Sequence, residues 1–171
     1  MPIKKLLLTT LIILAAFVAD LSSASTKPSE EEINNIFSSA ESLFKAMELK
    51  DYTVIWQSLT VKSQQRIVDA VYRAIIKKGI DTQKDIIRKD FIEGGEIAKA
   101  YWDNYLEAFN PNIVINQSKW TFKTLKSDSA EIDILYKKSS NPATLKLNRE
   151  NNTWKVGLEE TFGARNLIPF K

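Results

Sequence analysis

The side chains that most often carry catalysis are missing from this sequence. It contains neither histidine nor cysteine, which excludes Ser-His-Asp and Cys-His triads, histidine-ligated metal centres, thiolate zinc sites and disulfide bonds. Histidine is the side chain that ordinarily titrates near neutral pH. Any acid–base chemistry would therefore need a buried carboxylate, lysine or tyrosine with a displaced pKa, and we expect no cofactor.

Three aspartates are the candidates for a general base. Asp133 lies between two isoleucines, but strand alternation places it on the same polar face as Glu131. Asp103 falls on the polar arc of a helix, and Asp51 stands at a bend, where aspartate commonly accepts hydrogen bonds from backbone N–H groups. We expect structural roles for all three aspartates, and therefore assign no catalytic residue.

Ser42 and Lys45 have the Ser-x-x-Lys spacing of the penicillin-recognising enzymes. Those enzymes also need Ser-Asp-Asn and Lys-Thr-Gly elements and a chain about twice this length. Because both residues here lie within an amphipathic helical pattern, we interpret the match as coincidence. The Glu30-Glu31-Glu32 run suits the first turn of a helix electrostatically and needs no metal ion.

Large aromatic residues are the remaining candidates for a site. At their helical and strand spacing they could line one cavity between a long helix and a sheet, and several tyrosine hydroxyls converging on a hollow would indicate ligand recognition. The same spacing is typical of an ordinary core, which we favour. The ligand-cavity candidates are Tyr101, Trp102, Tyr105, Trp120, Phe122, Tyr136 and Trp154, with Phe109 beside them.

Two parts of the sequence must position these residues. The first part extends to Asn110 and has helical periodicity. Ser29 followed by Glu32 is a capping-box signature for a first helix, which the Lys50-Asp51-Tyr52 segment should end. A short apolar piece follows at residues 54–56. Ser63 can cap a second helix that Gly79 ends. Further helices are predicted over residues 81–91 and 96–109, separated by Gly94-Gly95.

The second part alternates apolar and polar residues with the period of a strand, after Asn110-Pro111 closes the helical part. Strands are predicted over residues 112–125, 130–136, 145–147 and 154–158. The turns between them are short, and short turns connect antiparallel neighbours. The predicted fold class is α+β, with N-terminal helices packed on one face of a curved four-stranded antiparallel sheet.

Residues 1–24 have the pattern of an export signal. Lys4 and Lys5 precede an apolar run from Leu6 to Val18, and Ser22-Ser23-Ala24 offers a cleavage point before Ser25. The run is well short of the ~20 residues that a spanning helix needs. We therefore predict cleavage, an exported protein that is periplasmic or secreted, and a single domain over residues 25–171. The alternative is that residues 6–18 are retained as an anchor.

The net charge of the chain is only +3, and the charge is split rather than extreme, with a small acidic excess over residues 25–110 and a basic excess over residues 111–171. Nucleic-acid domains usually concentrate far more lysine and arginine on one face or helix. We therefore expect no nucleic-acid partner.

Two segments carry a resemblance to a known family. The run from Ala46 to Thr60 is similar to the end of a first helix, a bend and a short second helix, and Asn152-Thr153-Trp154-Lys155-Val156 is similar to a closing strand. With helices preceding a meander over residues 30–162, the chain resembles the nuclear transport factor 2-like superfamily, which the ketosteroid isomerases and cystatin-like exported proteins also resemble. The resemblance implies a cone-shaped domain with a curved sheet wrapped around a long helix and a central cavity.

These patterns together predict an exported, non-catalytic binding or protein-interaction module of the cell envelope. Its partner would be a small apolar ligand or an envelope protein, and it would be a monomer or a weak homodimer without a stable membrane span. One alternative is a small-molecule enzyme of isomerase or hydratase type that uses a cavity carboxylate or tyrosine. Another is an anchored subunit of an envelope or secretion assembly.

Overall fold

The structure is a computed structural model that describes residues 28–163, so the predicted export signal lies outside the described residues. The α+β class, with helices before four antiparallel strands, is confirmed. Along the chain the elements are α1 (Glu30–Leu49), α2 (Tyr52–Gln57), α3 (Val61–Lys77), α4 (Lys84–Glu93), α5 (Glu96–Ala108), α6 (Pro111–Asn116), β1 (Ser118–Lys126), β2 (Ser129–Tyr136), β3 (Ala143–Glu150), β4 (Thr153–Gly157) and α7 (Leu158–Phe162).

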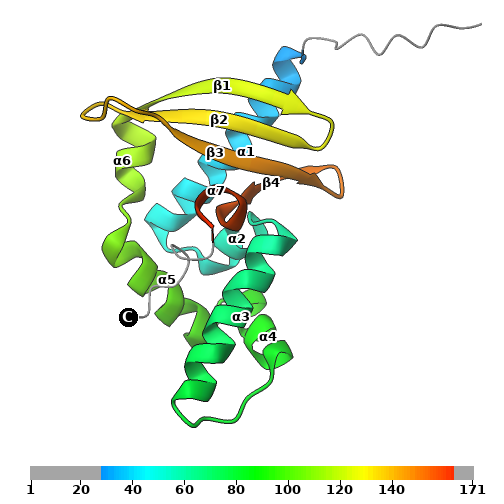
Figure 1. Cartoon of the computed structure of the whole chain (residues 1–171), viewed down its shortest axis with the longest axis vertical. Coiled ribbons are helices and arrows are strands. Elements are labelled where there is room, and N and C mark those ends of the chain that lie inside the picture. Colours follow the sequence, from blue (N-terminus) through cyan, green and yellow to red (C-terminus); the bar gives the residue numbers. More distant parts are fainter. Residues whose placement is uncertain (1–27, 164–171) are drawn as a thin grey trace, which may run out of the picture.

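The sheet lies at one end of the molecule, and the α3–α4 pair lies at the other (Figure 1). The strands of the sheet form an antiparallel meander in the order β1-β2-β3-β4, with a bulge in β1 after Phe122. Within the described residues, β1 pairs with β2 alone and is therefore an edge strand. The apolar face of the sheet is built from the pairs Trp120↔Ile134, Phe122↔Ile132, Ala130↔Leu147, Ile132↔Leu145 and Leu147↔Val156.

Helix α1 covers this apolar face from one border of the sheet to the other. The Phe44 ring of α1 contacts Trp120 of β1, and the Glu32 side chain of α1 accepts a hydrogen bond from Trp154 of β4. Its fully buried side chains recur at helical spacing: Ile36, Ala40, Leu43, Phe44 and Met47. Burying one such large side chain stabilises a fold by roughly 1.5–3 kcal/mol. Among residues 28–163, no helix has the length and apolar character that crossing a bilayer requires.

The connection between α2 and α3 joins the helices to the sheet. The Thr60 N–H donates to Val156 O at 3.0 Å, and the Val156 N–H donates to Ser58 O at 2.8 Å. Leu59 thereby forms a parallel bridge with Val156. The segment 58–60 thus occupies the free border of β4 at this point and fixes the start of α3 against the sheet.

The cap of α3 is Thr60, so the prediction that Ser63 caps this helix is wrong. The Thr60 hydroxyl accepts the Ser63 N–H at 3.2 Å and donates to Ser63 Oγ at 2.8 Å, and Ser63 Oγ donates to Glu160 Oε2 at 3.0 Å. Both hydroxyl residues are fully buried. Thr60 takes the cap position because its pairing with β4 holds it in the extended conformation that a cap needs.

The predicted strand start at Asn112 is also wrong, because residues 111–116 form helix α6 and β1 begins at Ser118. The Asn110 side chain accepts the Asn112 N–H at 3.0 Å, and Pro111 occupies the first helical position. Proline is favoured there because its fixed φ suits a helix and its missing N–H has no intrahelical partner. The β-branched residues 113–115 favour a strand by local propensity, which is why the sequence predicts one here.

Smaller boundary errors occur at two other elements. Helix α4 begins at Lys84 and not at Asp81, with Gln83 at the cap position. The last strand ends at Gly157, since Leu158 opens α7. The predicted ends at Gly79 and Gly94 hold, and both glycines have positive φ, a conformation that suits glycine because it has no Cβ.

We expect Thr60→Val to lower the free energy of unfolding by about 1–2 kcal/mol, because at nearly constant volume it removes the helix cap and leaves the buried Ser63 N–H without its acceptor. Urea denaturation measures this change. Thr121→Val, on the exposed side of β1, is the control and should change the value by less than about 0.5 kcal/mol. Equal effects of the two substitutions would contradict the structural role of Thr60.

Candidate ligand groove beside Trp120

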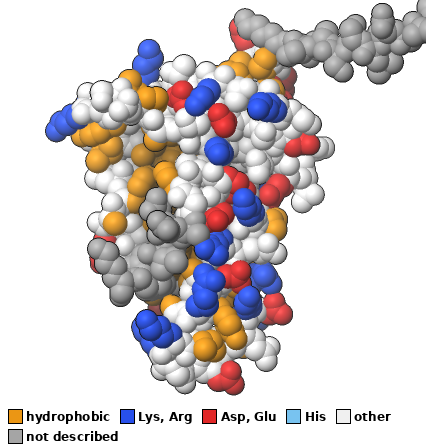
Figure 2. Space-filling model, viewed as in Figure 1, with side chains coloured by type: hydrophobic (Ala, Val, Ile, Leu, Met, Phe, Trp, Pro, Cys, Tyr) orange, Lys and Arg blue, Asp and Glu red, His pale blue; other side chains and the backbone are white. Residues whose placement is uncertain are grey.

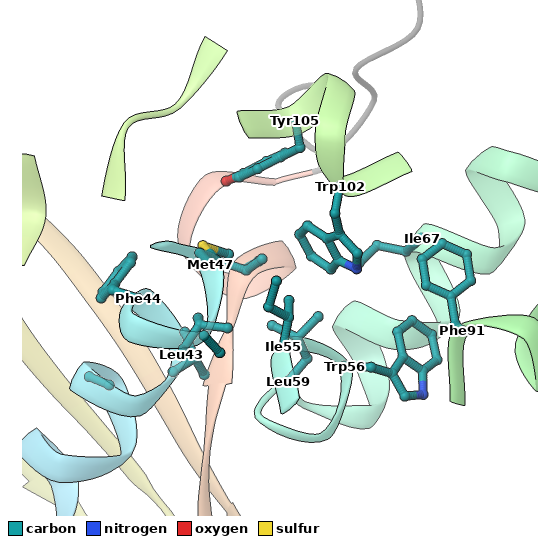
Figure 3. Close-up of a cluster of buried hydrophobic side chains, with 14 of the residues drawn as sticks. Leu43, Phe44, Met47, Ile55, Trp56, Leu59, Ile67, Phe91, Trp102 and Tyr105 are labelled. Atoms are coloured by element: carbon teal, nitrogen blue, oxygen red, sulfur yellow. The ribbon is translucent and has the colours of Figure 1, made fainter. Parts of the chain in front are cut away.

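Three of the aromatic candidates, Tyr101, Trp102 and Tyr105, lie on α5 and are buried in the centre of the helical part. The Trp102 ring packs edge-on against both tyrosines, with centroid distances of 4.9 and 5.5 Å. Trp102 and Tyr105 point toward the buried side chains of α1 and α2 (Figure 3). None of the three lines either of the hollows described below, and the rings fill space against one another.

A series of ring contacts leads from this centre to the surface. The centroid distances between successive rings range from 4.7 to 6.4 Å, and the rings in order are Trp56, Phe91, Tyr101, Trp102, Tyr105, Phe109, Phe44, Trp120 and Phe37. The last two rings are only partly buried. The structure thus brings four of the seven candidates into one series. Of these four, Trp120 is the one that is partly exposed to solvent.

A groove lies where this series ends. It has a volume of about 400 Å³ and is lined by Phe37 and Glu41 of α1, Ile115 of α6, and Ser118 and Trp120 of β1. The volume falls within the ~300–1,000 Å³ that is typical of small-molecule sites. Phe37 and Trp120 stand with their ring centroids 6.4 Å apart, so two aromatic side chains and an isoleucine border the same space.

The polar groups at this groove already have partners within the protein. Trp120 Nε1 donates to a backbone carbonyl of α6 at 2.9 Å, and Ser118 Oγ donates to another at 2.9 Å. The Glu41 carboxylate pairs with the Lys45 ammonium at 2.6 Å. These bonds fix the orientation of the indole, so that a ligand would meet the two rings and polar groups that are already paired.

The other three candidates lie outside the ring contacts described above. Phe122 packs on the covered face opposite Ile132, and Tyr136 is half-buried at the end of β2. Trp154 Nε1 donates to Glu32 Oε1 at 2.7 Å at the other border of the sheet. These three residues therefore do not share a hollow with the rings of α5.

Trp154 belongs to a clamp that we define as Glu32, Arg149 and Trp154. Arg149 pairs with Glu32 at 2.5 Å, and its guanidinium lies 4.7 Å from the Trp154 ring centroid. A second hollow of about 410 Å³ borders the clamp and is lined mainly by polar residues of α1. Because the charges of the clamp neutralise each other, we assign it to fixing the N-terminal half of α1 on β3 and β4.

The three aspartates lie outside the groove and have local partners. Asp103 accepts a hydrogen bond from Lys50 at 2.8 Å, and this bond is the main cause that lowers the pKa of its carboxyl. Asp133 accepts one from Thr144 at 2.6 Å, which likewise lowers its pKa. Asp51 caps α2. A general base that works near neutral pH has a raised carboxyl pKa, so the shifts of Asp103 and Asp133 run in the opposite direction.

The described part of the chain shows no contact between Ser42 and Lys45 and no cluster of metal-binding side chains. Ser42 is exposed on α1, and the Lys45 ammonium is paired with Glu41 instead. Residues 28–163 contain no group of three or more histidine, cysteine, aspartate or glutamate side chains that could hold a metal ion.

Sequence reasoning missed four of the five residues that line the groove. Phe37 lies beside the buried Ile36 in the predicted first helix, and only the packing of α1 leaves its ring partly exposed. Ile115 is not predicted to line a site, because it belongs to the β-branched run 113–115, which predicts a strand. Treating Asn110-Pro111 as a helix start would have placed Ile115 on a helix, although not beside α1.

Comparison with known proteins gives no relative of this chain. No family model, no curated protein and no solved structure matches it.

Burial raises the pKa of the Tyr105 phenol to about 12, because the phenolate is disfavoured away from water. In the unfolded chain a tyrosine titrates near pH ~10. The contribution of the buried, neutral phenol to the free energy of unfolding is therefore complete below pH ~10 and is lost as the pH rises toward ~12. We expect Tyr105→Phe to reduce this alkaline loss of unfolding free energy by about 1–1.5 kcal/mol at pH 11.

Urea denaturation at pH 8, 10 and 11 measures the effect. Tyr136→Phe, at a half-buried position on β2, is the control. If the two substitutions change the alkaline slope equally, the buried phenol of Tyr105 does not cause it.

Proposed function

We propose that this chain is an exported, non-catalytic binding module and that it binds a small apolar molecule in the groove beside Trp120. The observation that carries the proposal is the contact of the Phe37 and Trp120 rings, which together line a groove whose polar groups already have internal partners. Such a surface offers a ligand apolar contact and little competition from unpaired polar groups.

The environment of the carboxylates supports a non-catalytic role. The only carboxylate among the five lining residues is that of Glu41, and it is bound to the Lys45 ammonium. An isomerase or hydratase would need an acid or base free to exchange a proton with its substrate. If the protein were such an enzyme, Glu41→Gln would abolish turnover, whereas a binding module with this substitution keeps its affinity for a neutral ligand.

We extend the proposal to membership of the nuclear transport factor 2-like superfamily. Its support is the order of the elements, with helices before an antiparallel meander, and the course of α1 across the whole apolar face of the sheet. In this protein the space between α5 and α1 is filled by rings, so the proposed ligand site is the groove at the outer end of the ring series and not a central cavity.

The groove can be tested with the neutral fluorescent probe N-phenyl-1-naphthylamine. We expect Phe37→Ala to weaken probe binding about tenfold, because it removes one of the two rings that border the site. Phe162→Ala is the control, since Phe162 is a partly exposed phenylalanine on α7. Fluorescence titration gives both affinities, and the proposal fails if the Phe37 variant binds the probe as tightly as the unmodified chain.

Export is tested by sequencing the N-terminus of the protein recovered from cells that produce it. We expect a start at Ser25, because the small residues before it suit cleavage. A chain that still begins at Met1 and stays with the membrane fraction would instead support the anchored-subunit alternative.

A further inference from the structure

The end of the α3–α4 hairpin exposes isoleucines to solvent. We call residues 73–89 the hairpin tip, which comprises the end of α3, the connection and the first turns of α4. Ile76, Ile80 and Ile86 in this segment are 41, 56 and 57% exposed. The tip forms the end of the molecule that lies farthest from the sheet (Figure 1), so the isoleucines stand on a projecting surface.

The same segment carries a local excess of positive charge. Residues 73–89 contain six lysine and arginine residues and two aspartates. Lys84 pairs with Asp69, and Arg88 pairs with Asp85. Arg73, Lys77 and Lys78 are absent from the ion pairs of the described residues and are exposed. Figure 2 shows hydrophobic side chains intermixed with lysine and arginine at this end of the molecule.

We propose that the hairpin tip docks on an anionic lipid surface. Exposed isoleucines can enter the boundary between headgroups and acyl chains, while lysines beside them contact the negative headgroups. A projecting tip suits a deformable bilayer, and the charge excess selects an anionic one. The contact is peripheral, since the isoleucines lie at one end of the molecule and α3 and α4 themselves stay amphipathic.

This site is separate from the groove beside Trp120. The groove is formed by α1, α6 and β1, which lie at or near the sheet end, whereas the tip lies at the opposite end (Figure 1). A molecule bound to a membrane through the tip would therefore keep the groove accessible. The two proposals stand independently, and loss of one activity by substitution should leave the other unchanged.

Vesicle flotation tests the proposal with the full chain as it is recovered from producing cells, so that every variant has the same N-terminus. The vesicles contain either phosphatidylcholine alone or an equimolar mixture with phosphatidylglycerol. We expect binding to the anionic vesicles at least about tenfold tighter than to the neutral ones. The double substitution Lys77→Glu/Lys78→Glu should reduce anionic binding at least about tenfold, since each lysine near such a surface contributes roughly a factor of five.

Matched controls separate the tip from general surface effects. Lys137→Glu/Lys138→Glu reverses an equally adjacent and exposed lysine pair after β2 and should bind as the unmodified chain does. Ile80→Asp should weaken binding, whereas Ile92→Asp, at a 51% exposed isoleucine near the far end of α4, should not. The proposal is overturned if neutral vesicles bind equally well, if both lysine pairs matter equally, or if no variant of the tip changes binding.

Discussion

The pairing of residues 58–60 with β4 is the constraint on which the rest of the structure depends. Thr60 makes three kinds of contact at once: its N–H bonds to β4, its hydroxyl caps α3, and the same hydroxyl lies 3.1 Å from the Glu160 carboxylate of α7. Because both Thr60 and Ser63 are fully buried, these bonds form where an unpaired hydroxyl would be costly. One residue thereby links the helical part, the sheet and the last helix.

The local parts of this fold could be predicted from the sequence. The capping signal of Ser29, the stops at Gly79 and Gly94, and the alternation of β1 and β2 depend on neighbours within a few residues, and the structure has them. Helix α6 could not be recognised by the same means, because residues 113–115 are β-branched and favour a strand when read alone. The cap that Asn110 provides and the φ of Pro111 outweigh that preference.

Tertiary contacts are the part that the sequence does not contain in local form. Glu32 was identified from its spacing to Ser29, yet its carboxylate binds Trp154 and Arg149, more than a hundred residues along the chain. For the site, residue type and spacing picked out Trp120 and the buried rings of α5. Whether rings enclose a hollow or fill it depends on how far apart their elements pack, and the groove arises only where α1, α6 and β1 meet at the surface.

The two borders of the sheet are treated differently. Segment 58–60 covers the outer side of β4 at Val156. The border of β1 pairs with no other strand among residues 28–163, and β1 carries exposed lysines at positions 119 and 126, whereas its Lys123 reaches over the sheet to Asp133 and Thr144. Cationic side chains on an open border repel the approach of an identical strand. Growth of the sheet from molecule to molecule, the first step toward fibrils in a crowded compartment, is therefore opposed at both sides by different means.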